Sequence, residues 1–166
     1  MRAVSPLYRT RPVGVVDQAP FHNAVVALDV PRGPAAEVGA MALLVALKEL
    51  EQAFGRQARR RWGPRELDLD LLVFGRHRLH LPRAEAARSA DPGRLGAQWL
   101  DVPHPAAGER LFVLAPLADV APRLVPPGWA RTVTAARAVR ETIEGHDAVR
   151  LVGTWDGVVG AWATPR

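Results

Sequence analysis

The amino-acid sequence predicts an α+β fold, and three observations carry that prediction. Two short segments rich in β-forming residues, 4–10 and 23–30, lie near the N-terminus. A long segment of helical period follows at residues 36–54. Strand-like and helical segments do not alternate regularly after that, which favours an α+β layer architecture over a doubly wound parallel sheet.

The first two segments predict a hairpin-like start. They read as strands 4–10 and 23–30, and the loop between them contains Pro12, Gly14 and Pro20, which interrupt regular structure. The helix predicted at 36–54 has one apolar stripe with spacings of four and three, formed by Ala36, Ala40, Leu43, Leu47, Leu50 and Phe54.

The later elements follow from the same reasoning. Gly55 ends the helix, and an arginine-rich loop leads to a predicted strand at 67–74. The polar, small-residue segment 84–98 contains a proline and two glycines, which predicts an exposed loop insertion. Helices are expected at 109–118 and 133–144, and a short closing strand is expected at 148–152.

The composition is that of one globular domain, 1–166, with 48% hydrophobic and 23% charged residues. No apolar run approaches the roughly 18 residues that span a bilayer. The absence of cysteine excludes a disulfide framework and a thiolate metal site, and no signal peptide is apparent. We therefore expect a cytoplasmic protein with no membrane partner.

The net charge of +5 comes from arginine, because Lys48 is the only lysine. Such a balance suits a nucleic acid or a polyphosphate substrate, since the guanidinium group binds phosphate with two parallel hydrogen bonds. A GC-rich genome is an alternative source of the arginines.

The sequence RELDLDLL at 65–72 is the most informative stretch. On a strand the leucines point to one face, and Asp68 and Asp70 share the other at a separation of about 7 Å. Two such carboxylates repel each other unless a cation lies between them, and hard oxygen ligands favour Mg²⁺. The alternative is an exposed strand face that carries two aspartates by chance.

Arginines precede this diacid closely: Arg56, Arg59, Arg60, Arg61 and Arg65. A nucleoside triphosphate explains both signs of charge, because phosphoryl transfer needs cations on the phosphates and a metal held by carboxylates. The chain contains neither a Walker A motif nor a Rossmann glycine motif, so the arginines would have to contact the phosphates.

A series of motifs then resembles one known family. In order they are YRT (8–10), PVG (12–14), DQ (17–18), FHNA (21–24), GR (55–56), RWGPRELDLDLL (61–72), VPHP (102–105), ER (109–110), FVL (112–114) and PL (116–117). Their order and spacing resemble the 6-hydroxymethyl-7,8-dihydropterin pyrophosphokinase family of folate biosynthesis, over nearly the whole chain.

The resemblance implies a ferredoxin-like α+β fold, a mostly antiparallel sheet with helices packed on it. It also implies transfer of the terminal diphosphate of ATP to the hydroxymethyl group of the dihydropterin, with release of AMP. Two Mg²⁺ ions would be required. The partners would be these small molecules, with no nucleic acid.

Carried over by position, the resemblance implies that Asp68 and Asp70 hold the metals and that Arg56 and Arg65 are catalytic. The implied ATP-binding residues are Glu51, Arg59, Leu100, His104 and Arg110. The implied pterin-binding residues are Thr10, Pro12, Val13, Phe21, Asn23, Trp62 and Phe112.

Several of these positions have ordinary structural alternatives. Phe21 and Phe112 are alternatively core residues, and Asn23 is alternatively a turn residue. His104 is alternatively a structural loop histidine, and Glu51 alternatively belongs to a solvated helix face. Trp62 alternatively anchors the arginine loop.

The sequence departs from the family pattern at its start. The family's first strand, which bears a Gly-Ser-Asn turn, and the helix after it have no counterpart before Val4, so we expect a truncated version caused by a misassigned start. A smaller departure is Ala58 at a frequent arginine position, with Arg59 next to it as a substitute.

The truncation predicts that the chain alone aggregates or dimerises through an exposed sheet edge and is less active than an extended version. Otherwise, segment 148–152 would have to fill the vacant place in the sheet. Two other functions compete: a non-catalytic relic of the family, and a basic nucleic-acid-binding module suggested by the run at 59–61.

Overall fold

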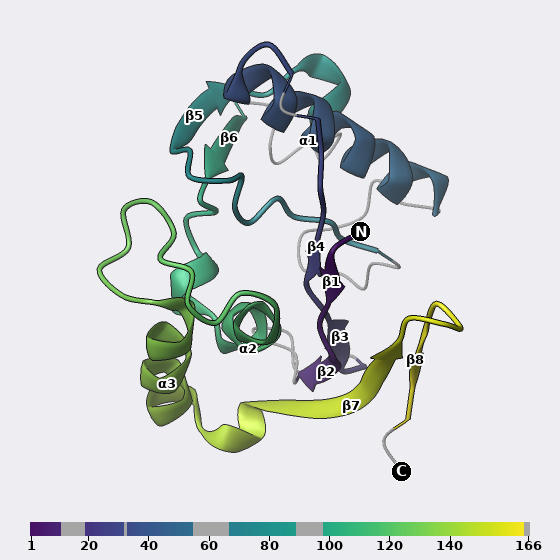
Figure 1. Cartoon of the computed structure of the whole chain (residues 1–166), viewed down its shortest axis with the longest axis vertical. Helices are drawn as coiled ribbons and strands as arrows, with labels where there is room; N and C mark the ends of the chain where they lie inside the picture. The colour runs from purple at the N-terminus through teal and green to yellow at the C-terminus, as the bar shows by residue number, and fades with distance from the viewer. Residues whose placement is uncertain (11–18, 32, 55–66, 89–97, 165–166) are drawn as a thin grey trace. The chain divides into compact units, whose positions relative to one another are not determined.

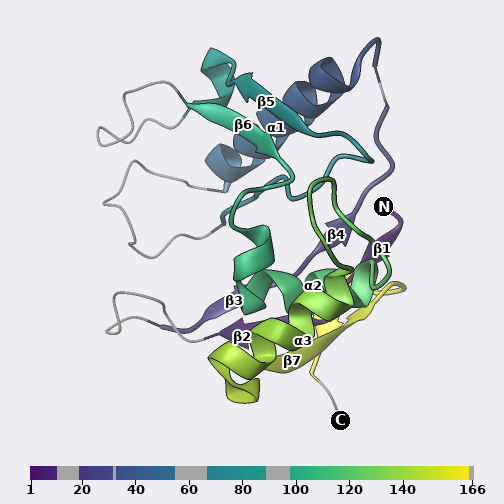
Figure 2. The ribbon, with the colours of Figure 1, turned by 90° about the vertical axis from the view of Figure 1, so that its left-hand side faces the viewer.

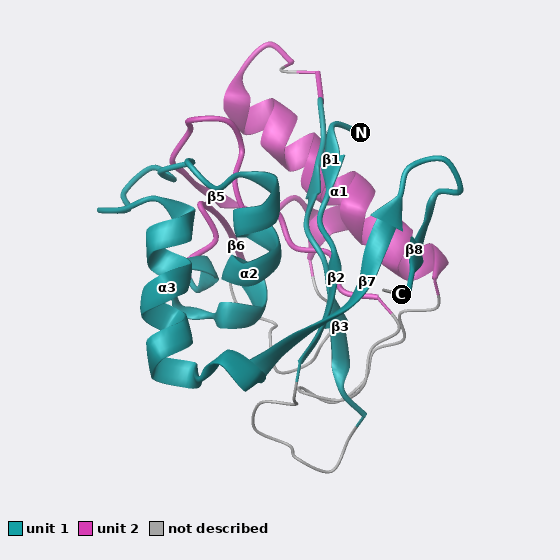
Figure 3. Ribbon diagram, turned by 60° about the horizontal axis from the view of Figure 1, so that its bottom comes forward, with its two compact units in different colours: residues 1–29, 106–166 teal, residues 30–105 magenta. Residues whose placement is uncertain are grey.

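The computed structural model describes residues 1–10, 19–31, 33–54, 67–88 and 98–164. The chain divides into two compact units, residues 1–29 with 106–166 and residues 30–105, coloured separately in Figure 3. Each unit is described by itself below. All described strand pairs are antiparallel and helices accompany them in both units, so the α+β class is confirmed. The single domain 1–166 stays a prediction.

The first unit contains a four-stranded sheet with the order β3-β2-β7-β8 and a separate two-stranded pair, β1-β4 (Figure 1). The strands are β1 (Ala3–Val4), β2 (Leu7–Thr10), β3 (Phe21–Asn23), β4 (Val26–Ala27), β7 (Val149–Asp156) and β8 (Ala161–Ala163). β2 pairs with β3, as expected for a hairpin-like start. β7 pairs with the other side of β2, so the predicted closing strand exists and is longer than expected.

Both predicted N-terminal strands are interrupted. Ser5 and Pro6 separate β1 from β2, and the Ser5 hydroxyl oxygen accepts the backbone N–H of Val25 at 2.9 Å. Pro6 has no N–H to donate to a ladder. Of the predicted strand 23–30, Asn23 ends β3 and Val26–Ala27 form β4, whereas residues 28–30 are in no strand. The chain thus changes its pairing partner within each segment.

Helices α2 (Leu111–Val120) and α3 (Val133–Glu144) pack against each other in the first unit (Figure 2). Leu114, Leu117, Val133 and Ala136 form their buried contact. Thr132 caps α3 by accepting the N–H of Ala135 at 3.2 Å, which is the usual role of threonine at this position. α3 has the predicted bounds, and α2 begins two residues later than predicted.

The second unit is formed by α1 (Ala36–Ala53), by the hairpin of β5 (Leu79–Pro82) and β6 (Trp99–Val102), and by the short 3-10 helix η1 (Glu85–Ala87). Its core contains Ala40, Leu44, Leu71, Phe74, Leu79, Ala87, Leu100 and Val102. The predicted α1 is confirmed, whereas β5 was not predicted.

Residues 84–86 and 88 of the predicted insertion 84–98 are exposed, but Ala87 is not, and the insertion itself stays a prediction. η1 lies inside it, and Ala87 is 1% exposed within the core. The backbone N–H of Arg83 donates to Gln98 at 2.8 Å, so the two ends of the segment continue the β5-β6 hairpin. Residues 89–97 lie outside the described part of the chain.

The apolar stripe predicted for α1 is wrong at its C-terminal end. Leu50 is 49% exposed and Phe54 is 65% exposed, whereas Ala40, Leu44 and Glu51 are buried. The buried face therefore passes through a charged residue in the last turn.

Candidate functional site

The segment that carries the two aspartates alternates in burial along residues 67–71. Asp68 and Asp70 are exposed, Leu67 and Leu69 are half-buried, and Leu71 belongs to the core. The two carboxylates thus lie on the solvent side of an extended segment whose leucines face inward, as the alternation predicts.

This segment is not a strand, however, and the prediction of a strand at 67–74 is wrong for the described residues. A strand requires a ladder of backbone hydrogen bonds to a neighbour. Here the backbone groups of Leu69 bond to side chains instead. Two backbone contacts come from outside the segment: the N–H of His104 donates to Leu72 at 2.9 Å, and the N–H of His77 donates to Phe74 at 3.1 Å.

Two side chains from the last turns of α1 hold Leu69. Its N–H donates to Oε1 of Glu51 at 2.6 Å, and its carbonyl accepts from Nζ of Lys48 at 2.8 Å. Lys48 also donates to the same Oε1 at 2.7 Å. The helix therefore holds the backbone at the residue that separates the two aspartates.

Glu51 is buried, with its side chain 0% exposed, so the alternative of a solvated helix face is wrong. An ionised carboxylate is costly to bury unless charged and hydrogen-bonding partners compensate. Lys48 and the N–H of Leu69 supply both kinds of partner. Sequence reasoning placed Glu51 near the nucleotide and did not identify Lys48 as its partner, although their i,i+3 spacing on a helix is the signal for such a pair.

The predicted nucleotide residues near β6 have different environments. The side chain of Leu100 is 2% exposed and belongs to the core, so a ligand contact at this position would come from its backbone. His104 is half-buried and follows the cis Val102–Pro103 bond. ATP binding by both residues stays a prediction.

The β5-β6 hairpin also carries a cluster of one histidine, one aspartate and one tryptophan that was not predicted from the sequence. Nδ1 of His80 lies 2.6 Å from Oδ1 of Asp101, and its ring stacks on Trp99 with centroids 4.3 Å apart. β5 was not predicted, and only the strand register brings these residues together.

The donor set of the diacid fits Mg²⁺. Carboxylate oxygens are hard ligands, and Mg²⁺ in nucleotide sites is usually bound by one or two carboxylates together with substrate phosphates and water. Among the described residues no group of three or more His, Cys, Asp or Glu gathers as a metal site. Two aspartates with phosphate ligands therefore match this mode of binding.

The described candidates for pterin binding lie in the first unit. Thr10 and Phe21 are paired across β2 and β3, and Oγ1 of Thr10 accepts from Nδ2 of Asn23 at 2.9 Å. Phe21 is 37% exposed, so it is not a core residue. Asn23 lies in a strand and not in a turn.

Phe112 and Arg110 lie at the start of α2, which packs against β2 and β3. The guanidinium carbon of Arg110 lies 5.8 Å from the centre of the Phe112 ring, within cation–π distance. Phe112 is half-buried, so part of its ring is accessible.

The structure thus describes Thr10, Phe21, Asn23, Arg110 and Phe112 in one unit and the diacid, Glu51, Leu100 and His104 in the other. The remaining candidates lie outside the described residues: Pro12, Val13, Arg56, Arg59, Trp62 and Arg65.

Comparison with known proteins gives a family. Residues 1–122 match the model of the 7,8-dihydro-6-hydroxymethylpterin-pyrophosphokinase family. A 2-amino-4-hydroxy-6-hydroxymethyldihydropteridine pyrophosphokinase of Pseudomonas aeruginosa is 45% identical over 125 residues, which cover 75% of this chain and 64% of the relative. A Bacillus subtilis protein of the same name is 38% identical over 117 residues, covering 70% and 57%.

A Mycobacterium tuberculosis protein, also of that name, is 36% identical over 151 residues, covering 90% of this chain and 73% of the relative. The chain spans 57% to 64% of the length of the first three relatives. The family match covers both aspartates of the diacid and all described candidate residues. The chain belongs to the 7,8-dihydro-6-hydroxymethylpterin-pyrophosphokinase family.

Proposed function

We propose that the chain transfers diphosphate from ATP to 6-hydroxymethyl-7,8-dihydropterin and releases AMP, a step of folate biosynthesis. The observation that carries the proposal is the exposed Asp68 and Asp70 pair, held by α1 inside the family match. The names of the relatives support the same reaction.

In this reaction the hydroxymethyl oxygen attacks the β-phosphorus of ATP, and the bond from that phosphorus to the oxygen bridging the α-phosphate breaks. The hydroxyl proton goes to solvent or a base, and AMP leaves. Asp68 and Asp70 would hold Mg²⁺, which supplies charge neutralisation on the phosphates. A second Mg²⁺ and phosphate contacts from Arg56 and Arg65 complete the proposal.

The described aromatic and amide groups suit a pterin. The accessible rings of Phe21 and Phe112 suit stacking on a flat bicyclic ring, and the amide of Asn23 can read its polar edge. The bond from Asn23 to Thr10 fixes the amide orientation. Pro12, Val13 and Trp62 remain proposed contacts of the pterin, and Glu51, Arg59, Leu100, His104 and Arg110 remain proposed contacts of ATP.

No helix among the described residues is long and apolar enough to cross a membrane. The cytoplasmic location and the absence of a nucleic-acid partner remain proposals. A diacid beside the arginine run opposes binding of a polyanion in the absence of metal, which favours the nucleotide substrate.

The proposal is tested with ATP labelled at the γ-phosphate and the reduced pterin, with products separated by chromatography. We expect equimolar AMP and a labelled pterin diphosphate, formed only when pterin and Mg²⁺ are both present. Labelled inorganic phosphate with ADP, or no transfer at all, would contradict the proposal. The identity of the products, more than their rate, decides the reaction class.

A further inference from the structure

Lys48 and Glu51 on α1 form an ion pair that is largely buried, although charged side chains of a helix usually face solvent. Their side chains are 12% and 0% exposed, and they lie one turn apart at the end of the buried face. Burying such a pair gains little stability compared with apolar side chains of similar volume. Lys48 is also the only lysine of the chain. Stability alone therefore gives a weak reason for this pair.

The backbone contacts of the pair suggest a more specific role. The N–H of Leu69 belongs to the peptide group that joins it to Asp68, and Glu51 accepts that N–H at 2.6 Å. The carbonyl of Leu69 belongs to the peptide group that joins it to Asp70, and Lys48 donates to that carbonyl at 2.8 Å. Each aspartate is thus attached to a peptide group that the pair holds.

The segment needs such support because its side chains alternate in burial as in a strand although it is not part of a sheet. In a sheet, ladder hydrogen bonds would fix the direction of successive side chains. Here two charge-assisted hydrogen bonds replace ladder bonds at Leu69, and bonds to ionised groups are about twice as strong as neutral ones. Lys48 also compensates the charge of Glu51.

We propose that Lys48 and Glu51 form a positioning clamp that sets the spacing and direction of Asp68 and Asp70 for a divalent cation bound with nucleotide. This inference rests on the proposed function, in which the aspartates hold the metal. In this role Lys48 and Glu51 act on the aspartates through the backbone of Leu69, so they are positioning residues and not metal ligands, apart from the ATP contact proposed above for Glu51. Outer partners of metal ligands typically change metal affinity by about 10- to 100-fold when they are removed.

The test measures binding of Mn²⁺ by electron paramagnetic resonance in the presence of α,β-methylene-ATP, which cannot transfer its diphosphate. The clamp is removed in Lys48→Met/Glu51→Leu, which replaces both members of the buried ion pair by apolar side chains. Lys48→Arg keeps the positive charge. Glu49→Leu is the matched control, because it removes an exposed carboxylate from the same helix.

We expect the double variant to raise the Kd for Mn²⁺ about 10- to 100-fold while it unfolds cooperatively. Lys48→Arg should bind Mn²⁺ more tightly than the double variant does, because it keeps the positive charge. Glu49→Leu should leave the Kd for Mn²⁺ at the wild-type value. Wild-type Mn²⁺ affinity in the double variant, with affinity lost in Asp68→Asn and Asp70→Asn, would overturn the clamp and leave the metal assignment standing.

Unchanged Mn²⁺ binding in Asp68→Asn and Asp70→Asn would instead overturn the metal assignment and the clamp together. If the double variant does not fold, Lys48→Met/Glu51→Gln decides the matter by the same measurement, because it removes both charges and the bond to the Leu69 carbonyl while it keeps an acceptor for the Leu69 N–H. A Kd raised about tenfold at an unchanged unfolding midpoint then supports the clamp, and an unchanged Kd overturns it.

Discussion

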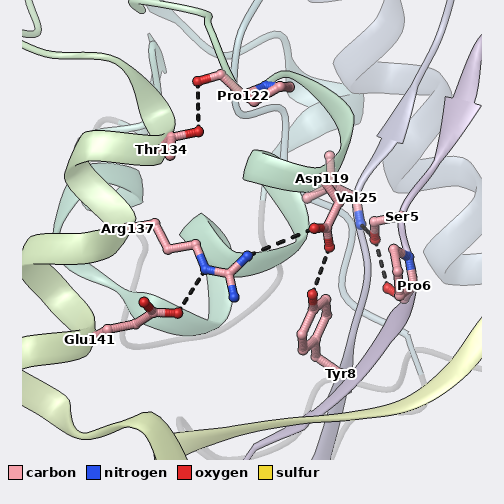
Figure 4. A network of polar contacts seen from close by, with 9 residues as sticks. All are labelled: Ser5, Pro6, Tyr8, Val25, Asp119, Pro122, Thr134, Arg137 and Glu141. Atoms are coloured by element: carbon pink, nitrogen blue, oxygen red, sulfur yellow. Dashed lines mark hydrogen bonds and ion pairs between the residues drawn. The ribbon is translucent and has the colours of Figure 1, made fainter.

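Tyr8 links the sheet of the first unit to both of its helices. Its hydroxyl donates to Oδ2 of Asp119 at 2.7 Å, and Oδ1 of Asp119 lies 3.7 Å from Arg137 (Figure 4). Arg137 in turn donates to Glu141 at 2.8 Å. Burial of the ring, followed by the bond to Asp119 and the charge of that carboxylate, raises the pKa of Tyr8 to about 12.

A spectroscopic titration tests this contact, because Tyr8 is the only tyrosine of the chain. The tyrosinate absorbance should have its midpoint near pH 12 in the folded protein and near 10 in denaturant. The raised pKa means that Tyr8 contributes stability in full below pH 10, and that this contribution is lost as the pH rises from 10 to 12.

Asp119→Asn is the informative variant for Tyr8. It removes the charge of the carboxylate and leaves the ring buried, so the midpoint should fall part of the way towards 10. A midpoint near 10 in the folded wild-type protein would mean that the network does not hold Tyr8.

At the level of single residues, the sequence predicts where Asp68 and Asp70 lie, but it does not predict the side chains that hold the backbone between them. The alternation of Leu and Asp alone is enough to place Asp68 and Asp70 on one side of their segment. The hydrogen bonds of Lys48 and Glu51 to Leu69 join residues about twenty positions apart, and no local pattern reveals such contacts. His80 and Asp101 are a further case of a pair joined only by strand register.

Among the elements, α1 begins at the predicted residue and ends one residue earlier than predicted, and its buried face differs in part from the predicted one. Helical periodicity finds the helix, but the stripe through Leu50 and Phe54 diverges from the face that packs in the core. Helical periodicity assigns a charged residue such as Glu51 to the solvent-exposed face of the helix. The partners that allow it to be buried come from the same helix and from Leu69.

Two leucines of α1 test which face is buried. Leu44 is 2% exposed, so Leu44→Ala should lower the free energy of unfolding by about 2 to 5 kcal/mol through loss of burial and creation of a cavity. Leu50→Ala, the matched control at a position that is 49% exposed, should change it by less than about 1 kcal/mol. Denaturant unfolding of both variants measures the difference, and equal losses would favour the stripe predicted from the sequence.

For the molecule as a whole, the family match ends at residue 122, yet later elements complete the first unit. β7 pairs with β2, so segments from both halves of the chain share one sheet, and α3 packs against α2 from the same half. The sequence predicts a strand at 148–152 and a helix at 133–144. It does not predict the partner of that strand, because antiparallel pairing over such a separation depends on the whole fold.

The central claim is that Asp68 and Asp70 form the metal site of a diphosphate transfer. The direct measurement is pterin-dependent release of AMP at saturating Mg²⁺ by the wild-type chain, Asp68→Asn, Asp70→Asn and the control Glu85→Gln, an exposed carboxylate of the same unit. We predict that the rate of AMP release falls about 10²- to 10³-fold in either aspartate variant, while its unfolding midpoint stays unchanged. The control variant should match the wild type in both measurements. Near wild-type AMP release from either aspartate variant would contradict the claim.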